Sequence, residues 1–158
     1  MNLSASFGLL LAATLIISAL LYGPNLEIFF DPPSLTILLG LATAWGLLAF
    51  GAAALSKALK TVLRAPFRSG PLVTDESAPE QVAMLREMRS QLYYAAVVGV
   101  LIGWIQMAAS MEDLSTFGPA WAVSMLALFY ALLLDQCLVK PALHRLQRQV
   151  ESRKVAEG

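Results

Sequence analysis

Cysteine, histidine and charged residues are scarce in this sequence, and each scarcity excludes a class of function. One cysteine, Cys137, leaves no partner for a disulfide within the chain, and one histidine, His144, is too few for a histidine-based metal site. Only 14% of the residues are charged. We find no nucleophile beside a base, no phosphate-binding loop and no group of metal ligands. The sequence therefore predicts a protein that is not an enzyme, uses no cofactor and binds no nucleic acid.

The few charged residues leave long stretches of the sequence without any charge. No charged side chain occurs from Met1 to Leu26 or between Ser34 and Ser56, and 58% of all residues are hydrophobic. A bilayer core requires about 20 apolar helical residues. We therefore predict an all-α integral membrane protein with a single membrane domain. Its four predicted transmembrane helices are about 3–22, 35–55, 92–111 and 117–139, with a linker at 56–91 and a tail at 140–158 that is helical at first and frayed at its end.

The first apolar run could be a cleavable signal peptide or a retained helix. No Lys or Arg precedes it, and no small-x-small cleavage site follows it, so we predict a retained helix. The pair Pro32-Pro33 then predicts a turn at the membrane surface before the second span. Within that span, Gly40, Ala44, Gly46 and Gly51 are expected to allow close helix contacts.

The distribution of charge predicts the topology. All 11 Lys and Arg residues lie in the linker or after Val139, whereas the other two connections hold only the acids Glu27, Asp31, Glu112 and Asp113. Positive charge in short loops marks the cytoplasmic side. Both termini and the linker are therefore predicted to be cytoplasmic, and the acidic turns external, in a multi-pass membrane protein.

Small and polar residues recur every three or four positions in the third and fourth spans, which places them on one face of each helix. Helices in lipid associate through such close backbone approach and through hydrogen bonds. These faces are Ala96, Gly99, Gly103, Gln106 and Ser110 in the third span, and Ala120, Ser124, Ala127, Ala131 and Asp135 in the fourth.

Asp135 is an acidic residue near the inner end of the fourth span, and two interpretations of it stay open. Acidic groups in membrane helices often serve ion pathways. The alternative is a structural ion pair with Lys140 or Arg145, or a carboxylate that reaches the interface. Gln106 is predicted to be buried and to form an interhelical hydrogen bond.

The linker is predicted to contain two helices. Lys57, Lys60, Arg64 and Arg68 line one face of the first, which favours a basic collar beside lipid headgroups over a dedicated partner site. Gly70-Pro71 ends it. Ser77 and Glu80 have the spacing of a capping box, so a second helix is predicted to begin there and to continue into the third span.

Four short strings occur in order along the chain, at residues 30–34, 99–107, 118–123 and 129–141. Together they resemble the family of ion-channel proteins that includes MotA, TolQ and ExbB, and in particular the flagellar stator A-subunit. Phe30-Asp31-Pro32-Pro33-Ser34 resembles the stretch before that family's second helix. Gly99-Val100-Leu101-Ile102-Gly103 followed by Gln106-Met107 resembles "G-T-L-I-G…Q-M" of its third helix. The helix-opening motif Gly118-Pro119, with Ala122-Val123, resembles "G-P-x-x-A-V" of its fourth helix, and Phe129-Tyr130 with Pro141 resembles the end of that helix.

The resemblance implies a pentameric ring of this chain around a single-span B-type partner that carries an Asp in its membrane helix. It implies that the third and fourth helices line an ion path and that ion flow, here of protons, drives rotation. Pore-lining residues would be Gly99, Val100, Gly103, Gln106, Ser124, Ala127, Ala131 and, near the exit, Asp135.

Two departures from the family pattern bear on this function. Val100, Ala127 and Leu128 stand where the family often has hydroxyl side chains, which can ligate a cation. Ser124 could supply a replacement hydroxyl, or it could bond to its own preceding carbonyl. The linker 56–91 is also much shorter than the family's cytoplasmic domain. The alternative function is therefore a non-conducting membrane scaffold that keeps the fold.

Overall fold

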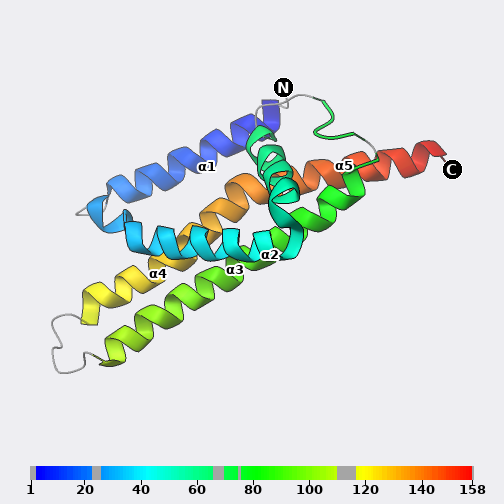
Figure 1. Cartoon of the computed structure of the whole chain (residues 1–158). Helices are drawn as coiled ribbons and strands as arrows, with labels where there is room; N and C mark the ends of the chain where they lie inside the picture. Colours follow the sequence, from blue (N-terminus) through cyan, green and yellow to red (C-terminus); the bar gives the residue numbers. More distant parts are fainter. Residues whose placement is uncertain (1–2, 23–25, 66–69, 75, 110–116, 158) are drawn as a thin grey trace.

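The computed structural model describes residues 3–22, 26–65, 70–74, 76–109 and 117–157, and every regular element in these ranges is helical (Figure 1). The elements are α1 (Leu3–Leu21), a 3-10 turn η1 (Leu26–Phe29), α2 (Pro32–Arg64), α3 (Ala78–Ala109), α4 (Phe117–Leu134), a π-helical turn η3 (Asp135–Val139) and α5 (Lys140–Glu157). Within the described ranges, three helical stretches are long and apolar enough to cross a membrane, Pro32–Arg64, Ala78–Ala109 and Ala120–Ala156, and Leu10–Leu21 is a shorter apolar stretch. The prediction of an all-α membrane protein is confirmed.

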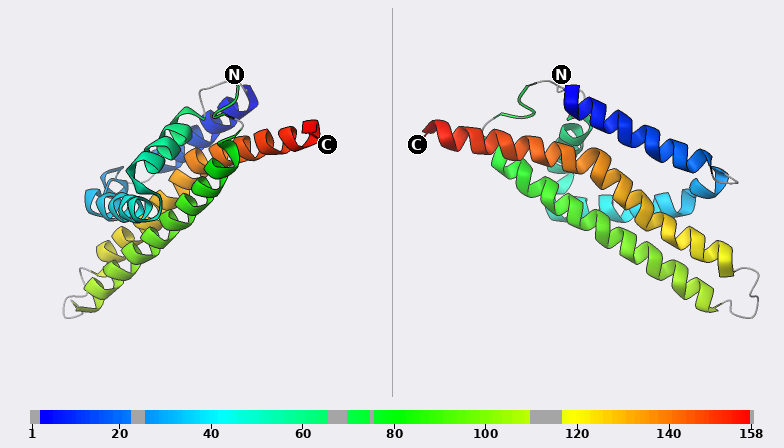
Figure 2. Two further views of the ribbon diagram at one scale, coloured as in Figure 1. Left: turned by 45° about the vertical axis from the view of Figure 1, so that its right-hand side comes forward. Right: turned by 180° about the vertical axis from the view of Figure 1, so that it is seen from behind.

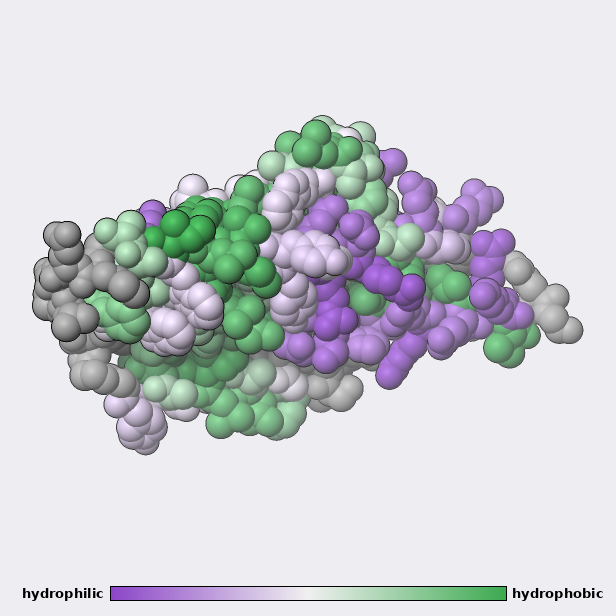
Figure 3. Space-filling view, turned by 90° about the horizontal axis from the view of Figure 1, so that it is seen from below, coloured by the Kyte–Doolittle hydropathy of each residue, from purple (hydrophilic) through white to green (hydrophobic). Residues whose placement is uncertain are grey.

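α3 and α4 form an antiparallel hairpin, the first part of α2 packs across it, and α1 lies at the periphery (Figures 1 and 2). The start of α1, the start of α3 and the end of α5 lie toward one end of the molecule (Figure 2). On the face shown in Figure 3, apolar side chains gather over the part of the helices away from α5, and polar side chains gather toward the end occupied by α5. The surface of α1 is apolar, with Phe7 68% and Leu10 67% exposed, as suits contact with lipid or a neighbouring subunit.

α2 begins three residues earlier than predicted. Asp31 is its N-cap, and its carboxylate accepts a hydrogen bond of 2.9 Å from the backbone N–H of Ser34. Pro32 and Pro33 occupy the first turn, where a missing N–H costs nothing because that group has no partner inside the helix. The prediction that this pair forms a turn outside the helix is therefore wrong.

α2 is not one straight span. Gly51 has φ 75° and ψ 166°, a backbone conformation that essentially only glycine adopts, and it divides α2 into a first limb (32–50) and a second limb (52–64). The second limb leaves at a steep angle to the first (Figure 1). Of the four small residues expected to allow close contact, only Gly46 is buried, and a Cβ there would lie 3.0 Å from Leu55 Cδ1. Gly40, Ala44 and Gly51 are exposed.

α3 confirms the prediction of one long helix that begins inside the linker and continues into the third span. It starts at Ala78, one residue after the proposed cap. Ser77 Oγ donates to the Thr74 carbonyl at 3.0 Å and lies 2.8 Å from Thr74 Oγ1. The residue before the helix thus bonds backward to the preceding turn.

The fourth span does not end at Val139, because α4, η3 and α5 run on as one helical rod to Glu157. Pro141 lacks an N–H and would clash with the carbonyl four residues before it in a regular helix. The π-helical turn immediately before it widens the spiral, and the Lys140 N–H bonds to the Asp135 carbonyl, five residues back. The tail was predicted to be helical at first and frayed at its end; the helix is confirmed, and it continues to Glu157.

Two apolar clusters hold the helices together. One lies between α2, α3 and α4, and the other lies between the second limb of α2, α3 and α5 at the polar end. In the first, Tyr130 is 8% exposed and its hydroxyl donates to the Phe29 carbonyl at 2.7 Å and accepts from the Asp31 N–H at 2.9 Å. The end of η1 and the start of α2 are thereby fixed to the last part of α4.

Candidate functional site: a buried carboxylate in the π-helical turn

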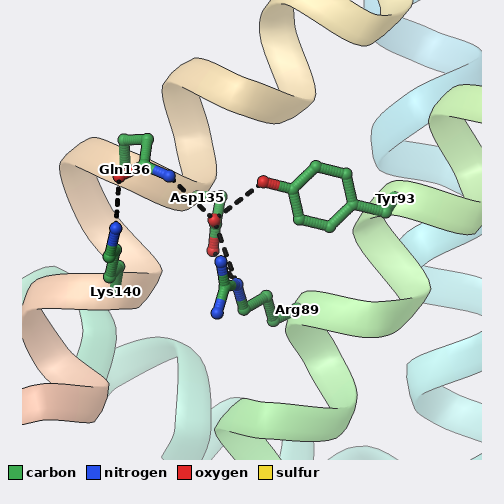
Figure 4. A network of polar contacts seen from close by, with 5 residues as sticks. All are labelled: Arg89, Tyr93, Asp135, Gln136 and Lys140. Carbon is green, nitrogen blue, oxygen red and sulfur yellow. Dashed lines mark hydrogen bonds and ion pairs between the residues drawn. The ribbon is translucent and has the colours of Figure 1, made fainter.

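Asp135 is the first residue of η3 and is completely buried, at 0% exposure. The site is built by α3, which presents Arg89 and Tyr93, four residues apart and therefore on one face, toward the turn (Figure 4). The antiparallel α3–α4 hairpin brings these two residues level with Asp135. A carboxylate that is removed from water needs such partners, because an unpaired buried charge is very costly.

Arg89 is the counter-ion of Asp135. Its Nε lies 2.8 Å from Asp135 Oδ1 and donates a hydrogen bond of 3.0 Å to Oδ2. Oδ1 receives the attraction of the guanidinium without a hydrogen bond, since the Nε–H is directed at Oδ2. The Arg89 side chain is 36% exposed, so the pair joins a solvent-accessible cation to an inaccessible anion.

Tyr93 completes the site. Its hydroxyl donates to Asp135 Oδ2 at 2.8 Å, and its ring centroid lies 6.0 Å from the Arg89 guanidinium carbon, at the limit of a cation–π contact. Gln136 Nε2 lies 3.5 Å from the same oxygen, and Lys140 Nζ donates to Gln136 Oε1 at 3.0 Å (Figure 4). Hydrogen bonds from Tyr93 and Gln136 and the positive charge of Arg89 thus compensate for the burial of this carboxylate.

Asp135 forms an ion pair, as one of its two interpretations predicted, but its partner is Arg89 and not the predicted Lys140 or Arg145. A role of Asp135 in an ion pathway stays a prediction. Lys140 bonds to Gln136, and Arg145 bonds to the Ala65 and Gly70 carbonyls. Arg89 was assigned to the linker, three residues before the predicted third span. One sequence signal points to it: a hairpin that turns at Glu112-Asp113 sets residue 135 level with residue 90. Glu112 and Asp113 themselves lie outside the described residues.

The small-residue faces of α3 and α4 contact each other. A Cβ added to Gly103 would lie 2.6 Å from Ser124 Cβ, and one added to Gly99 would lie 3.0 Å from Ala127 Cβ. Ser124, Ala127 and Ala131 are 3%, 2% and 0% exposed. We call this contact, made by Gly99, Gly103, Ser124, Ala127 and Ala131, the hairpin seam. Ser124 Oγ donates to the Trp121 carbonyl at 2.8 Å, so the alternative in which it bonds to its own helix is confirmed.

The remaining predicted residues lie at or beyond the edges of the hairpin seam. Val100 is half-buried and Gln106 is exposed, so the prediction of a buried Gln106 is wrong. Gly118 is exposed in the first turn of α4, with no atom within 4 Å of an added Cβ. Pro119 follows it in α4, and its side chain lies outside the described part. Among the described residues, no group of three or more His, Cys, Asp or Glu side chains could hold a metal ion.

The chain resembles motility proteins over part of its length. It is 26% identical over 102 residues to the chemotaxis protein PomA of Vibrio alginolyticus, a match that covers 61% of this chain and 40% of the relative. It is 28% identical over 74 residues to motility protein A of Aquifex aeolicus (strain VF5), covering 47% of this chain and 29% of the relative. The chain thus spans less than half the length of the curated relatives it matches. No family model matches the chain.

Proposed function

We propose that this chain is the channel-forming A-subunit of a proton-driven rotary membrane motor, assembled as a pentameric ring around a single-span B-type partner. The similarity to two motility proteins carries the proposal. The fold supports it, because α3 and α4 form a tight hairpin of small residues and the apolar surface of α1 is available for lipid or a second copy. The membrane would be the bacterial inner membrane, with both termini cytoplasmic, and no catalysis is proposed.

We propose fewer residues for the ion path than the sequence alone predicts. Ser124, Ala127 and Ala131 of the hairpin seam have almost no accessible surface. A Cβ added to Gly99 or Gly103 would meet Ala127 or Ser124, so we assign the seam to holding α3 and α4 together at close range. Val100 and Gln106 flank the seam and keep accessible surface, so they are the residues proposed to face the partner helix. Asp135 at the polar end would hold Arg89 in place and would set the charge at the exit.

The test is reconstitution with a candidate partner. The chain is co-purified with a single-span protein whose membrane helix contains an Asp, and the mass of the complex is measured. Proton flux is then followed in vesicles, with the partner's Asp→Asn variant as the matched control. A ring with more than two copies of this chain and flux abolished by that variant are expected. Only monomers or dimers would refute the ring.

The second candidate function is a non-conducting scaffold. The apolar side chains of Val100, Ala127 and Leu128 favour it, since none can ligate a cation or hold a water. A ring that assembles with the partner but shows no flux above empty vesicles would establish the scaffold and reject the channel.

A further inference from the structure

A cleft lies between the second limb of α2 and the start of α3, at the polar end of the molecule. Its volume is about 550 Å³. Three cations from one limb line it, together with one acid from α3: Lys57, Lys60, Arg64 and Glu80. Within the described ranges, these three cations form no ion pair. The lining is therefore strongly positive, and it favours an anion.

Gln81 provides a second and independent indication of a ligand. Its side chain lines the same cleft and is only 4% exposed. Its Nε2 donates to Met84 Sδ at 3.7 Å, whereas its Oε1 has no hydrogen-bond partner. A buried amide oxygen without a partner costs free energy comparable to a lost hydrogen bond. A ligand in the cleft that carries a hydrogen-bond donor beside its negative charge would satisfy it.

The position of the cleft identifies the source of such a ligand. The second limb follows the Gly51 bend, where the apolar first limb ends, and Leu59 and Leu63 on it are 50% and 52% exposed. Phe50 lines the cleft beside the cations. Basic residues next to exposed leucines are typical of a helix that lies in the headgroup layer. An anion bound here would sit where phospholipid headgroups are concentrated.

We propose that this cleft binds the headgroup of an anionic phospholipid that carries a hydroxyl group, with phosphatidylglycerol as the fitting chemistry. The phosphate accepts hydrogen bonds from the lysine ammonium groups, and a glycerol hydroxyl donates to Gln81 Oε1. The site requires only that the chain be embedded in a membrane, so it does not depend on the proposed motor function.

The first test removes charge. Binding of phosphatidylglycerol is measured by native mass spectrometry after titration into the full chain in detergent. Lys57→Gln/Lys60→Gln is expected to weaken binding about 30-fold, from two cations near the headgroup. The matched control, Arg148→Gln/Lys154→Gln, removes equal charge from α5 and is expected to change binding less than 3-fold. Equal losses in the two variants would show a diffuse basic surface and would overturn the site.

The second test addresses the hydroxyl. Phosphatidylethanol has the same charge and no headgroup hydroxyl, so it is expected to bind about 10-fold more weakly than phosphatidylglycerol, the equivalent of one hydrogen bond. Gln81→Met is expected to abolish that preference and leave phosphatidylethanol binding unchanged. Equal binding of both lipids by the unaltered chain would overturn the assignment. Displacement of the lipid by about 10 mM inorganic phosphate would show a free-phosphate site, which would overturn the lipid identity.

Discussion

Replacing Gly103 by alanine tests whether the hairpin seam holds α3 and α4 together. The added Cβ would lie 2.6 Å from Ser124 Cβ and 3.4 Å from Ser124 Cα. Carbon atoms in favourable contact lie about 3.5–4.0 Å apart, so the closer contact is short by about 1 Å. Ser124 cannot easily yield, because it is buried and bonded to the Trp121 carbonyl. The helices must separate, and we expect Gly103→Ala to lower the free energy of unfolding by about 1–3 kcal/mol.

The same substitution elsewhere in the membrane helices provides the control. Gly40→Ala meets no atom within 4 Å, so it is expected to be neutral or slightly stabilising. Gly99→Ala, with its contact of 3.0 Å to Ala127 Cβ, is expected to be intermediate.

A double variant isolates the clash itself. Ser124→Gly removes the atom that Gly103→Ala would strike, so the two changes together should cost less than their sum. The measurement is reversible unfolding in mixed micelles with increasing dodecyl sulfate, followed by circular dichroism. If Gly103→Ala unfolds at the same denaturant fraction as Gly40→Ala, the close approach of the two helices is refuted.

Three further substitutions test other features of the fold by the same assay. Arg89→Gln leaves Asp135 buried without a counter-ion and should lower the free energy of unfolding by about 3 kcal/mol. The double variant Arg89→Met/Asp135→Leu should recover much of this loss, and no recovery would contradict the ion pair as its cause. Gly51→Ala forces a side chain into a conformation with φ 75° and should cost about 1–3 kcal/mol, and an unchanged stability would show that α2 can straighten. Tyr130→Phe removes two hydrogen bonds to the α1–α2 connection and should cost about 1–2 kcal/mol, while Tyr94→Phe, on a residue that is 62% exposed, should cost nothing measurable.

Hydrophobic runs and periodicity were sufficient to predict the helices, because lipid permits few other backbone structures. The spacing of Gly99 and Gly103 also predicted a close contact, although their partners proved to be Ser124 and Ala127 of the same chain. A single sequence cannot say which of several small faces meets which, since that depends on how the helices are arranged around one another.

The errors have local physical causes. The Gly51 bend was missed because a glycine in an apolar run fits a straight helix as well as a bent one, and only tertiary contacts decide between them. The π-helical turn was missed because Pro141 is a stop signal in most helices, and the widened turn that tolerates it has no sequence signature of its own. The Arg89 partner was missed because the helix was assumed to enter the membrane three residues after it.

The π-helical turn has a consequence for everything that follows it in the chain. The π-helical turn contains one residue more than an α-helical turn would need. Because each residue of an α-helix advances the spiral by roughly 100°, α5 is rotated about its axis by that angle relative to an unbroken continuation of α4. This phase shift is what directs Ala142 and Leu146, both 0% exposed, at the second limb of α2. Loss of one residue from 135–139 would swing that apolar stripe into water while leaving the composition of the helix almost unchanged.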